Sequence, residues 1–391
     1  MAISCTHEPM TIAISTDLHY LAKRLYEKER PYAKICQQAR NSEYLLDWLL
    51  EEMDPQTIDV LLLTGDLASN GEKESHREFI KKLNRIKERG IQVFVLPGNH
   101  DIRHQKASEY IDGKIYPTET IGETDFRTMY ASFGYDQALS TDQDSLSYVA
   151  ELSEDSWLIC LDNCCRVNEI PQRYGKLKTE TLAWLERNLK CAKEQKISVY
   201  VAGHYNLAYH NQLFRKGFTM RNHQQVSELL HKYDVQLFFS GHMHMQHMGV
   251  ENGVTDIATA SLATYPHQYG VLKINQKQEI SYHTKQLSLP EFKRMSYYQF
   301  YYEDFIVQIL EELEQLSGVD WAVRQKMAFF AAKMNLHYFG GTFYTIAEVA
   351  RQTQEWKLWK QYGTELFFYQ YLQSMFEDSM YDHNNYYKRE R

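Results

Sequence analysis

The chain has 391 residues, a length that allows two or three domains and a sizeable hydrophobic core. Its apolar content of 43% and aromatic content of 14% suit a globular protein. The net charge of −8 argues against binding of long nucleic acid, which needs many Lys and Arg side chains on one face. It does not argue against binding of a small ligand.

Six cysteines are present, none of them in a CxxC pair, and a chain of this length needs no disulfide bonds for stability. We therefore expect reduced, mostly buried thiols in a cytoplasmic protein. The first ten residues lack a basic stretch followed by an apolar one, so we expect no signal peptide. The longest apolar runs have the length of a strand, so we expect no membrane span. The cysteines are Cys5, Cys36, Cys160, Cys164, Cys165 and Cys191.

Six short apolar segments in the first two thirds of the chain are typical of buried β-strands. They are rich in β-branched or aromatic residues and end at Gly, Pro or Asp. Amphipathic segments between them predict helices at 42–53, 75–90 and 179–195, the first and third starting at a capping Ser42 and Thr179. Strands that alternate with helices predict an α/β domain. The strands are expected at 11–16, 59–64, 92–97, 156–162, 198–203 and 235–241.

The pattern changes toward the end of the chain. Residues 250–285 favour strands, and beyond Pro290 three successive patterns predict helices, with Ser-Gly and Gly-Gly breaks between them. We therefore predict an α/β domain at 1–285 and an all-α domain at 286–391, with its last residues, 381–391, frayed. The helical patterns cover 291–316, 320–339 and 345–363.

Side chains that can bind metal ions follow five of the expected strands. Each set lies in the first positions after its strand, and glycines beside most of them allow a tight turn of the backbone. Since sites in α/β sheets form at the carboxyl ends of strands, all five sets can converge on one edge. The residues are Asp17 with His19, Asp66, Asn99 with His100 and Asp101, His204, and His242 with His244.

With His100 set aside as a catalytic candidate, these side chains form a mixed oxygen and nitrogen set without a thiolate. Such a set suits divalent Mn, Fe, Zn, Co, Ni or Mg and argues against a structural thiolate zinc site. Seven ligands exceed what one ion with an open position needs, so they fit two ions bridged by one carboxylate. Paired ions can activate a water for in-line displacement at a phosphoryl group.

The order D-x-H, G-D, G-N-H-D, G-H and G-H-x-H resembles the calcineurin-like metallophosphoesterase superfamily over residues 11–285. The resemblance implies an α/β (α+β) fold in which two mixed β-sheets form a sandwich flanked by helices, to which the all-α domain is added. It also implies the ligands of each ion. Asp17, His19 and His244 would bind the first ion, Asn99, His204 and His242 the second, and Asp66 would bridge them.

The same resemblance implies that His100 is catalytic rather than a ligand. It would stabilise developing charge or protonate the leaving oxygen, with Asp101 orienting it. The sequence departs from the family pattern at the fourth motif, where many relatives have two consecutive histidines. Here Tyr205 follows His204, so His204 is the only candidate ligand at that motif.

A finer resemblance involves STDLHYL, TGDLASNGEKESH, PGNHDI, SGHMHMQ and SLATYPHQYG, which look like segments of bacterial class III cyclic-nucleotide phosphodiesterases, some of which carry a C-terminal helical domain. This implies hydrolysis of a small phosphodiester, a 3′,5′-cyclic nucleotide first. A phosphomonoesterase, or a phosphodiesterase acting on nucleotides, glycerophosphodiesters or phosphoproteins, stays open because fold does not fix substrate. A nuclease should show a basic groove, and a non-catalytic scaffold should lack ligands.

Several residues outside the motifs carry weaker expectations. The tyrosines of the first C-terminal helical pattern favour interface packing over a base-stacking lid. We expect the C-terminal domain to act as a lid or an interface, with a homo-oligomer as one form of the latter. Neither a nucleic acid polymer nor a membrane is expected as a partner. The candidate substrate contacts, with solvated loop positions as the alternative, are Asn70, His76, Tyr205 and His210.

Overall fold

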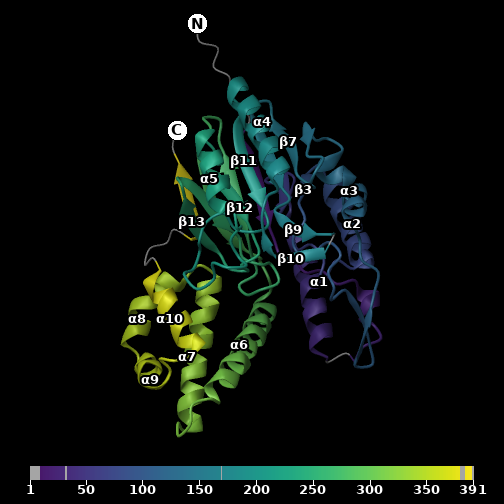
Figure 1. The fold of residues 1–391 in the computed structure, drawn as a ribbon. Coiled ribbons are helices and arrows are strands. Elements are labelled where there is room, and N and C mark those ends of the chain that lie inside the picture. The colour runs from purple at the N-terminus through teal and green to yellow at the C-terminus, as the bar shows by residue number, and fades with distance from the viewer. Residues whose placement is uncertain (1–8, 31–32, 169, 379–383, 390–391) are drawn as a thin grey trace.

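The computed structural model describes residues 9–30, 33–168, 170–378 and 384–389. Two mixed β-sheets pack against each other, helices cover their outer faces, and a group of C-terminal helices lies at one end of this sandwich (Figure 1). The predicted fold class is confirmed.

The first sheet has six strands in the order β17-β16-β15-β1-β2-β3. β1, β2 and β3 are parallel, whereas β15 and β16 add antiparallel strands on the other side of β1. All four residues of β2 are buried, as expected for a central strand covered on both faces. The bounds are β1 Met10–Ser15, β2 Val60–Leu63, β3 Gln92–Val95, β15 Gln268–Ile274, β16 Ile280–Gln286 and β17 Tyr386–Arg389.

The second sheet has seven strands in the order β13-β14-β12-β11-β8-β7-β6. Its centre is parallel, from β14 through β12 and β11 to β8, and both edges are antiparallel. Two short hairpins, β4–β5 and β9–β10, lie outside the sheets. The bounds are β4 Ser108–Ile111, β5 Lys114–Pro117, β6 Ser140–Thr141, β7 Tyr148–Ser153, β8 Ser156–Leu161, β9 Cys164–Val167, β10 Ile170–Gly175, β11 Ser198–Gly203, β12 Leu237–Ser240, β13 His247–Glu251 and β14 Val254–Ala258.

Helices cover the outer faces of both sheets. Apolar side chains of α1 and α2 join the core of the first sheet, and those of α4 and α5 pack on the second. The two predicted caps are wrong: Ser42 lies inside α1 and donates to the carbonyl of Leu18, and Thr179 is the first helical residue of α4, after Lys178 at the N-cap. The bounds are α1 Lys34–Glu52, α2 Lys73–Glu88, α3 Glu123–Met129, α4 Thr179–Gln195 and α5 His223–Lys232, with short turns η1 Lys23–Leu25 and η2 Ala131–Tyr135.

The C-terminal helices follow the predicted order but with one additional break. The pattern predicted as one helix over 345–363 is divided, because Thr353 adopts an extended conformation and its hydroxyl caps the next helix at the backbone N–H of Trp356. The bounds are α6 Glu291–Leu313, α7 Trp321–Phe339, η3 Phe343–Thr345, α8 Ala347–Gln352, α9 Gln354–Tyr362 and α10 Phe367–Glu377.

The prediction that residues 381–391 are frayed is wrong for the part that the structure describes. Tyr386–Arg389 form β17, which pairs antiparallel with β16 at the edge of the first sheet. The pairing satisfies backbone groups of β16 that would otherwise face solvent. Residues 381–383 and 390–391 lie outside the described residues, as does Cys5.

The C-terminal helices pack onto the end of the sandwich where the parallel strands end. Met243 and Met245 belong to the apolar core of these helices, although they alternate with His242 and His244 in one loop. Tyr297 and Tyr301 of α6 pack against the ring of His267, so the tyrosine cluster contributes to interface packing as predicted. The loop of the fifth motif thus carries predicted metal ligands and also core residues of the C-terminal helices.

Two further predictions can be compared with the structure. Within the described residues, no helix is both long and apolar enough to span a bilayer. The five described cysteines have free thiols; Cys36, Cys160 and Cys164 are buried, whereas Cys191 is exposed.

Candidate metal centre and active site

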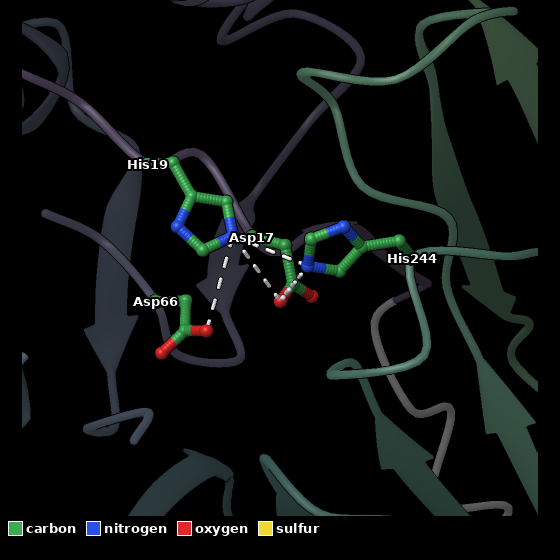
Figure 2. A group of neighbouring side chains, drawn as sticks. All are labelled: Asp17, His19, Asp66 and His244. Atoms are coloured by element: carbon green, nitrogen blue, oxygen red, sulfur yellow. Dashed lines mark hydrogen bonds and ion pairs between the residues drawn. The ribbon is translucent and has the colours of Figure 1, made fainter. Parts of the chain in front are cut away.

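The five predicted strand ends meet at one edge of the sandwich. Asp and His side chains from four of them form two groups whose ligand atoms all lie within 4.8 Å of one another in each group. From the fifth, Oδ1 of Asn99 lies 3.0 Å from Nε2 of His204. The first group contains Asp17, His19, Asp66 and His244; Asp17 and His19 share one loop, and the other two residues come from two further loops (Figure 2). The second contains Asp66, His204 and His242. Asp66 belongs to both groups, which is the position that a bridging carboxylate requires.

Much of this centre is built on left-handed backbone. Such conformations are uncommon for residues other than glycine and cost energy that the surrounding structure must supply. Their concentration here is typical of a functional site, where the surrounding structure holds side chains in unfavourable backbone conformations. The five residues, with φ between +46° and +66°, are Asp17, His19, Asp66, His242 and His244.

Two glycines leave room for the carboxylates of the centre. A Cβ at Gly98 would overlap the side chain of Asp66, and one at Gly241 would overlap Asp17 and Thr16. The glycines of the G-N-H-D and G-H-x-H motifs are therefore required by close packing against the acidic side chains.

The first group brings together ligand atoms that do not satisfy one another. Nε2 of His19 and Nε2 of His244 lie 3.1 Å apart, and Nε2 of His244 lies 3.1 Å from Oδ1 of Asp17. That buried Oδ1 has no hydrogen-bond partner in the described residues. Burying such an oxygen is unfavourable unless something pairs with it. A cation between these atoms would satisfy all three.

The second group shows the same pattern. Nδ1 of His204 lies 2.9 Å from the carbonyl oxygen of Thr64, and because a carbonyl can only accept, Nδ1 carries the proton. In the neutral ring Nε2 then has a lone pair, yet it faces Oδ2 of Asp66 at 3.3 Å and Oδ1 of Asn99 at 3.0 Å. Without a cation, a proton on Nε2 can bridge these oxygens; a metal ion that displaced this proton would meet three acceptors, as around a metal site.

The electrostatics of the centre favour bound positive charge. Burial alone would lower the pKa of His204, but Asp66 and Asp17 outweigh it and raise that pKa to about 9. Burial lowers the pKa of His19 to about 3 and that of His242 to about 4, which keeps both rings neutral and able to coordinate. The acidic residues thus attract a cation, and two of the imidazoles stay available to it.

Hydrogen bonds outside the ligand set hold the loops together. The backbone N–H of His242 donates to Oδ2 of Asp17 at 2.9 Å, and the hydroxyl of Ser261 donates to the carbonyl of Asp17 at 2.7 Å. The first and fifth motifs are therefore joined directly, 225 residues apart in sequence.

His100 lies beside the two groups. Its backbone N–H donates to Oδ1 of Asp66 at 2.8 Å, and its Nδ1 lies 2.9 Å from the carbonyl oxygen of Ser69 and 3.1 Å from Oδ1 of Asn70. The ring stacks on His104 with centroids 4.4 Å apart and meets the ring of His19 edge-on. Because Nδ1 donates to these oxygens, Nε2 is the ring atom that can serve a reacting group.

Residues 10–246 match the calcineurin-like phosphoesterase family. The chain belongs to this family. It is a phosphoric ester hydrolase, as the sequence predicted, and residues 278–382 also match the C-terminal domain of cyclic nucleotide phosphodiesterase.

Relatives of this phosphoesterase agree with that assignment. The chain is 25% identical to a 3′,5′-cyclic-nucleotide phosphodiesterase of Nostoc sp. over 273 residues, or 69% of this chain and 85% of that protein. It is 26% identical to a probable cyclic nucleotide phosphodiesterase of Moraxella catarrhalis, over 48% of this chain and 59% of that one. A dimetal phosphatase structure from Danio rerio shares the fold, with a TM-score of 0.53 and 13% identity over 71% of this chain and 96% of its own.

The structure does not support the predicted role of Asp101 in this phosphoesterase. Its carboxylate accepts hydrogen bonds from the backbone N–H groups of Ala68 and Gly98, at 2.9 and 2.7 Å. The residues that orient His100 are instead Ser69 and Asn70. Burial, and then the charge of Asp66, raises the pKa of Asp101 to about 7. Asp101 therefore connects the loop that carries Asp66 to the loop that carries Asn99 through these hydrogen bonds.

The four candidate substrate contacts have different outcomes. Asn70 holds the ring of His100. His76 is fully buried, and its ring nitrogens bond the hydroxyl of Tyr130 and the carbonyl of Asp101. His210 is buried and bonds Asp256 and His247. Both histidines are structural, so the prediction of substrate contact is wrong for them.

Tyr205 is buried and packs its ring 4.1 Å from that of His242. It therefore supports a predicted metal ligand from behind. Sequence reasoning missed two neighbours of the centre, His104 and Gly217. His104 is four residues after His100, and no pattern links the two rings; Gly217 lies in a loop without a motif.

Proposed function

We propose that this enzyme hydrolyses a small phosphodiester, with a 3′,5′-cyclic nucleotide as the leading substrate, at a centre of two divalent metal ions. The observation that carries the proposal is the sharing of Asp66 between two groups of ligand atoms. The substrate class is supported by the match of residues 278–382 to the C-terminal domain of cyclic nucleotide phosphodiesterase and by the phosphodiesterase from Nostoc sp..

The proposal assigns a role to each ligand-type side chain. When bound, the two ions would supply an activated water and positive charge for the transferring phosphoryl oxygens. The mixed set of carboxylates, imidazoles and one carboxamide suits Mn, Fe, Zn, Co, Ni or Mg. We assign Asp17, His19 and His244 to one ion, Asn99, His204 and His242 to the other, and Asp66 to both.

His100 would act on the substrate. With Nδ1 anchored to the carbonyl of Ser69, its Nε2 is held at a fixed position beside the ligand groups. The protonated ring can donate from Nε2 to the leaving oxygen or stabilise charge on the phosphoryl group. Asn70 supports this role, since it meets the same Nδ1.

Other functions fit the observations less well. A phosphomonoesterase would use the same centre and remains the main alternative, together with other small phosphodiesters. A nuclease acting on long nucleic acid fits poorly with a net charge of −8. A scaffold without activity fits poorly with a complete set of seven ligand-type side chains.

We also propose that the protein works in the cytoplasm and that its C-terminal helices form a lid or a subunit interface. Their surface exposes large apolar side chains, among them Phe292, Met295 and Trp321. Light scattering of the purified full chain tests the interface. A homo-oligomer would support a subunit interface, whereas a monomer would exclude it and favour the role of a lid.

The test of the proposed function is a substrate panel. The enzyme loaded with Mn is assayed on cyclic nucleotides, bis-p-nitrophenyl phosphate and p-nitrophenyl phosphate, with Asp66→Ala as the control. We expect kcat/KM to be highest for a cyclic nucleotide and to fall to background in the control. Hydrolysis of the monoester alone would replace the diesterase assignment with a phosphomonoesterase.

A further inference from the structure

A small pocket beside the metal centre is lined by cationic side chains. It has a volume of about 250 Å³ and lies where the loop between β11 and α5 meets strand β10. Its described lining contains no Asp or Glu, although the chain as a whole carries a net charge of −8. We call it the basic pocket; its cationic residues are Arg173, Arg215, Lys216 and Arg221.

The arginines of the basic pocket are held by aromatic rings rather than by acids. The guanidinium of Arg221 lies 3.3 Å from the ring centroid of Tyr174, and that of Arg215 lies 4.9 Å from the ring of Tyr209. No ion pair joins these arginines to an acidic group in the described part of the chain. Stacking on a ring fixes a guanidinium while its N–H donors stay available to a ligand.

The pocket adjoins the metal centre directly. Gly217 lines it, and the carbonyl oxygen of Gly217 accepts a hydrogen bond from Nε2 of His242 at 2.9 Å. The wall of the basic pocket therefore contacts a candidate ligand of the second ion, and a ligand that extends past the ring of His242 would meet the pocket.

A buried imidazole also lines the wall. His223 is more than nine tenths buried, and its Nε2 lies 3.1 Å from the hydroxyl of Tyr209. Its Nδ1 makes no hydrogen bond within the described residues but lies 3.6 Å from Oε2 of Glu251. His223 therefore holds the ring of Tyr209, on which Arg215 stacks, and adds to the rigid wall of the pocket.

We propose that the basic pocket binds a phosphate group other than the one hydrolysed at the metal centre. A phosphate presents several acceptor oxygens to the N–H donors of the arginines, and it carries the negative charge that the lining of the pocket lacks. This inference rests on the proposed function and narrows its substrate to phosphate esters with a second phosphate, such as a cyclic dinucleotide. A free phosphate ion bound beside a substrate with one phosphate would use the same contacts.

Binding measurements test the pocket without requiring turnover. Calorimetry compares adenosine 3′,5′-bisphosphate with AMP on the Mn-loaded full chain. The comparison is repeated with the double variant Arg215→Ala/Arg221→Ala. The single variant Lys216→Ala serves if the double variant does not fold. Arg187→Ala, which replaces an exposed arginine of α4, is the matched control. Inorganic phosphate is then titrated into AMP-saturated protein.

We expect the wild type and Arg187→Ala to bind the bisphosphate at least tenfold more tightly than AMP. The double variant should lose that advantage, since one charge-assisted hydrogen bond contributes about tenfold or more. If the pocket takes free phosphate instead, AMP-saturated wild type will bind one phosphate ion that the double variant does not. Equal behaviour of wild type and pocket variants in both titrations would overturn the proposal.

Turnover of bis-p-nitrophenyl phosphate separates this inference from the proposed function. If the wild type hydrolyses no diester but binds the bisphosphate through the arginines, the proposed phosphate site is supported and the diesterase assignment is refuted. If the wild type hydrolyses diesters but binds the bisphosphate no more tightly than AMP and binds no free phosphate, the diesterase assignment is supported and the phosphate site is refuted.

Discussion

The carbonyl oxygen of Gly217 accepts a hydrogen bond from Nε2 of His242 at 2.9 Å. Since a carbonyl can only accept, Nε2 holds the proton and Nδ1 is left as the ligand atom. Gly217 has a φ of +90°, in the left-handed region that favours glycine. One backbone conformation in a loop without a motif thus fixes the tautomer and direction of a predicted metal ligand.

We therefore predict that Gly217→Ala lowers the affinity for the second metal ion by about 10–100-fold, the usual effect of losing a partner of a ligand. Calorimetric titration of Mn into metal-free protein measures it. Gly318→Ala is the matched control, because Gly318 has a φ of +77° and open space around its missing Cβ. Equal metal affinity in the two variants would show that the Gly217 contact is dispensable.

His100→Ala should retain both metal ions but lower kcat by about 10²–10⁴-fold, the usual contribution of a positioned acid or base. His231→Ala, an exposed histidine on α5, should keep the wild-type rate. Metal content and kcat are measured on the same preparations. Loss of metal together with activity would make His100 a ligand and refute the role proposed for it.

The stability of the metal-free protein should depend on pH through His267, which lies under α6. Burial lowers its pKa to about 4 from a usual value of 6.5. Between these values the unfolded chain binds a proton that the folded chain does not. The free energy of unfolding is therefore highest above pH 6.5 and falls as the pH drops toward 4, by about 3 kcal/mol from this residue.

Urea unfolding of the wild type and His267→Gln at pH 5 and pH 7.5, with chelator present, checks this prediction. The wild type should lose more stability than the variant on acidification, because the variant has no imidazole to protonate. Parallel losses in the two proteins would assign the pH dependence to other groups.

The core of the C-terminal helices should depend strongly on Trp359. Its side chain is fully buried and donates from Nε1 to the carbonyl of Met327 at 2.9 Å. We expect Trp359→Ala to lower the free energy of unfolding by about 3–5 kcal/mol, as for other large buried side chains. Trp321→Ala, where the residue is 56% exposed, should change it by less than about 0.5 kcal/mol. Chemical denaturation followed by circular dichroism distinguishes them, and equal effects would contradict this packing.

Six of the strands, and the placement of motif residues after five of them, could be predicted because both follow local rules, whereas the strands between residues 108 and 153 and the β9–β10 hairpin were not predicted. Buried strands such as β2 are continuous apolar runs, and ligand-type residues directly after such strands must lie at their carboxyl ends. The convergence of Asp17, Asp66 and His244 in space follows from that placement.

Long-range contacts were harder to predict. Nothing local distinguishes His76 and His210, both buried in hydrogen-bond networks, from histidines that meet a substrate. Asp101 follows His100 in sequence, but its carboxylate turns toward backbone N–H groups of another loop. The edge strand β17 reads as a polar tail, because only its pairing with β16, about a hundred residues earlier, orders it.

The central claim is that two metal ions bind between the two groups that share Asp66. Elemental analysis of the full chain, purified with Mn and freed of loosely bound ions, tests it most directly, with Asp66→Ala alongside. We expect saturation at two ions per wild-type chain and fewer than one in the variant, since the shared carboxylate serves both positions. Saturation of the wild type at a single ion would contradict it.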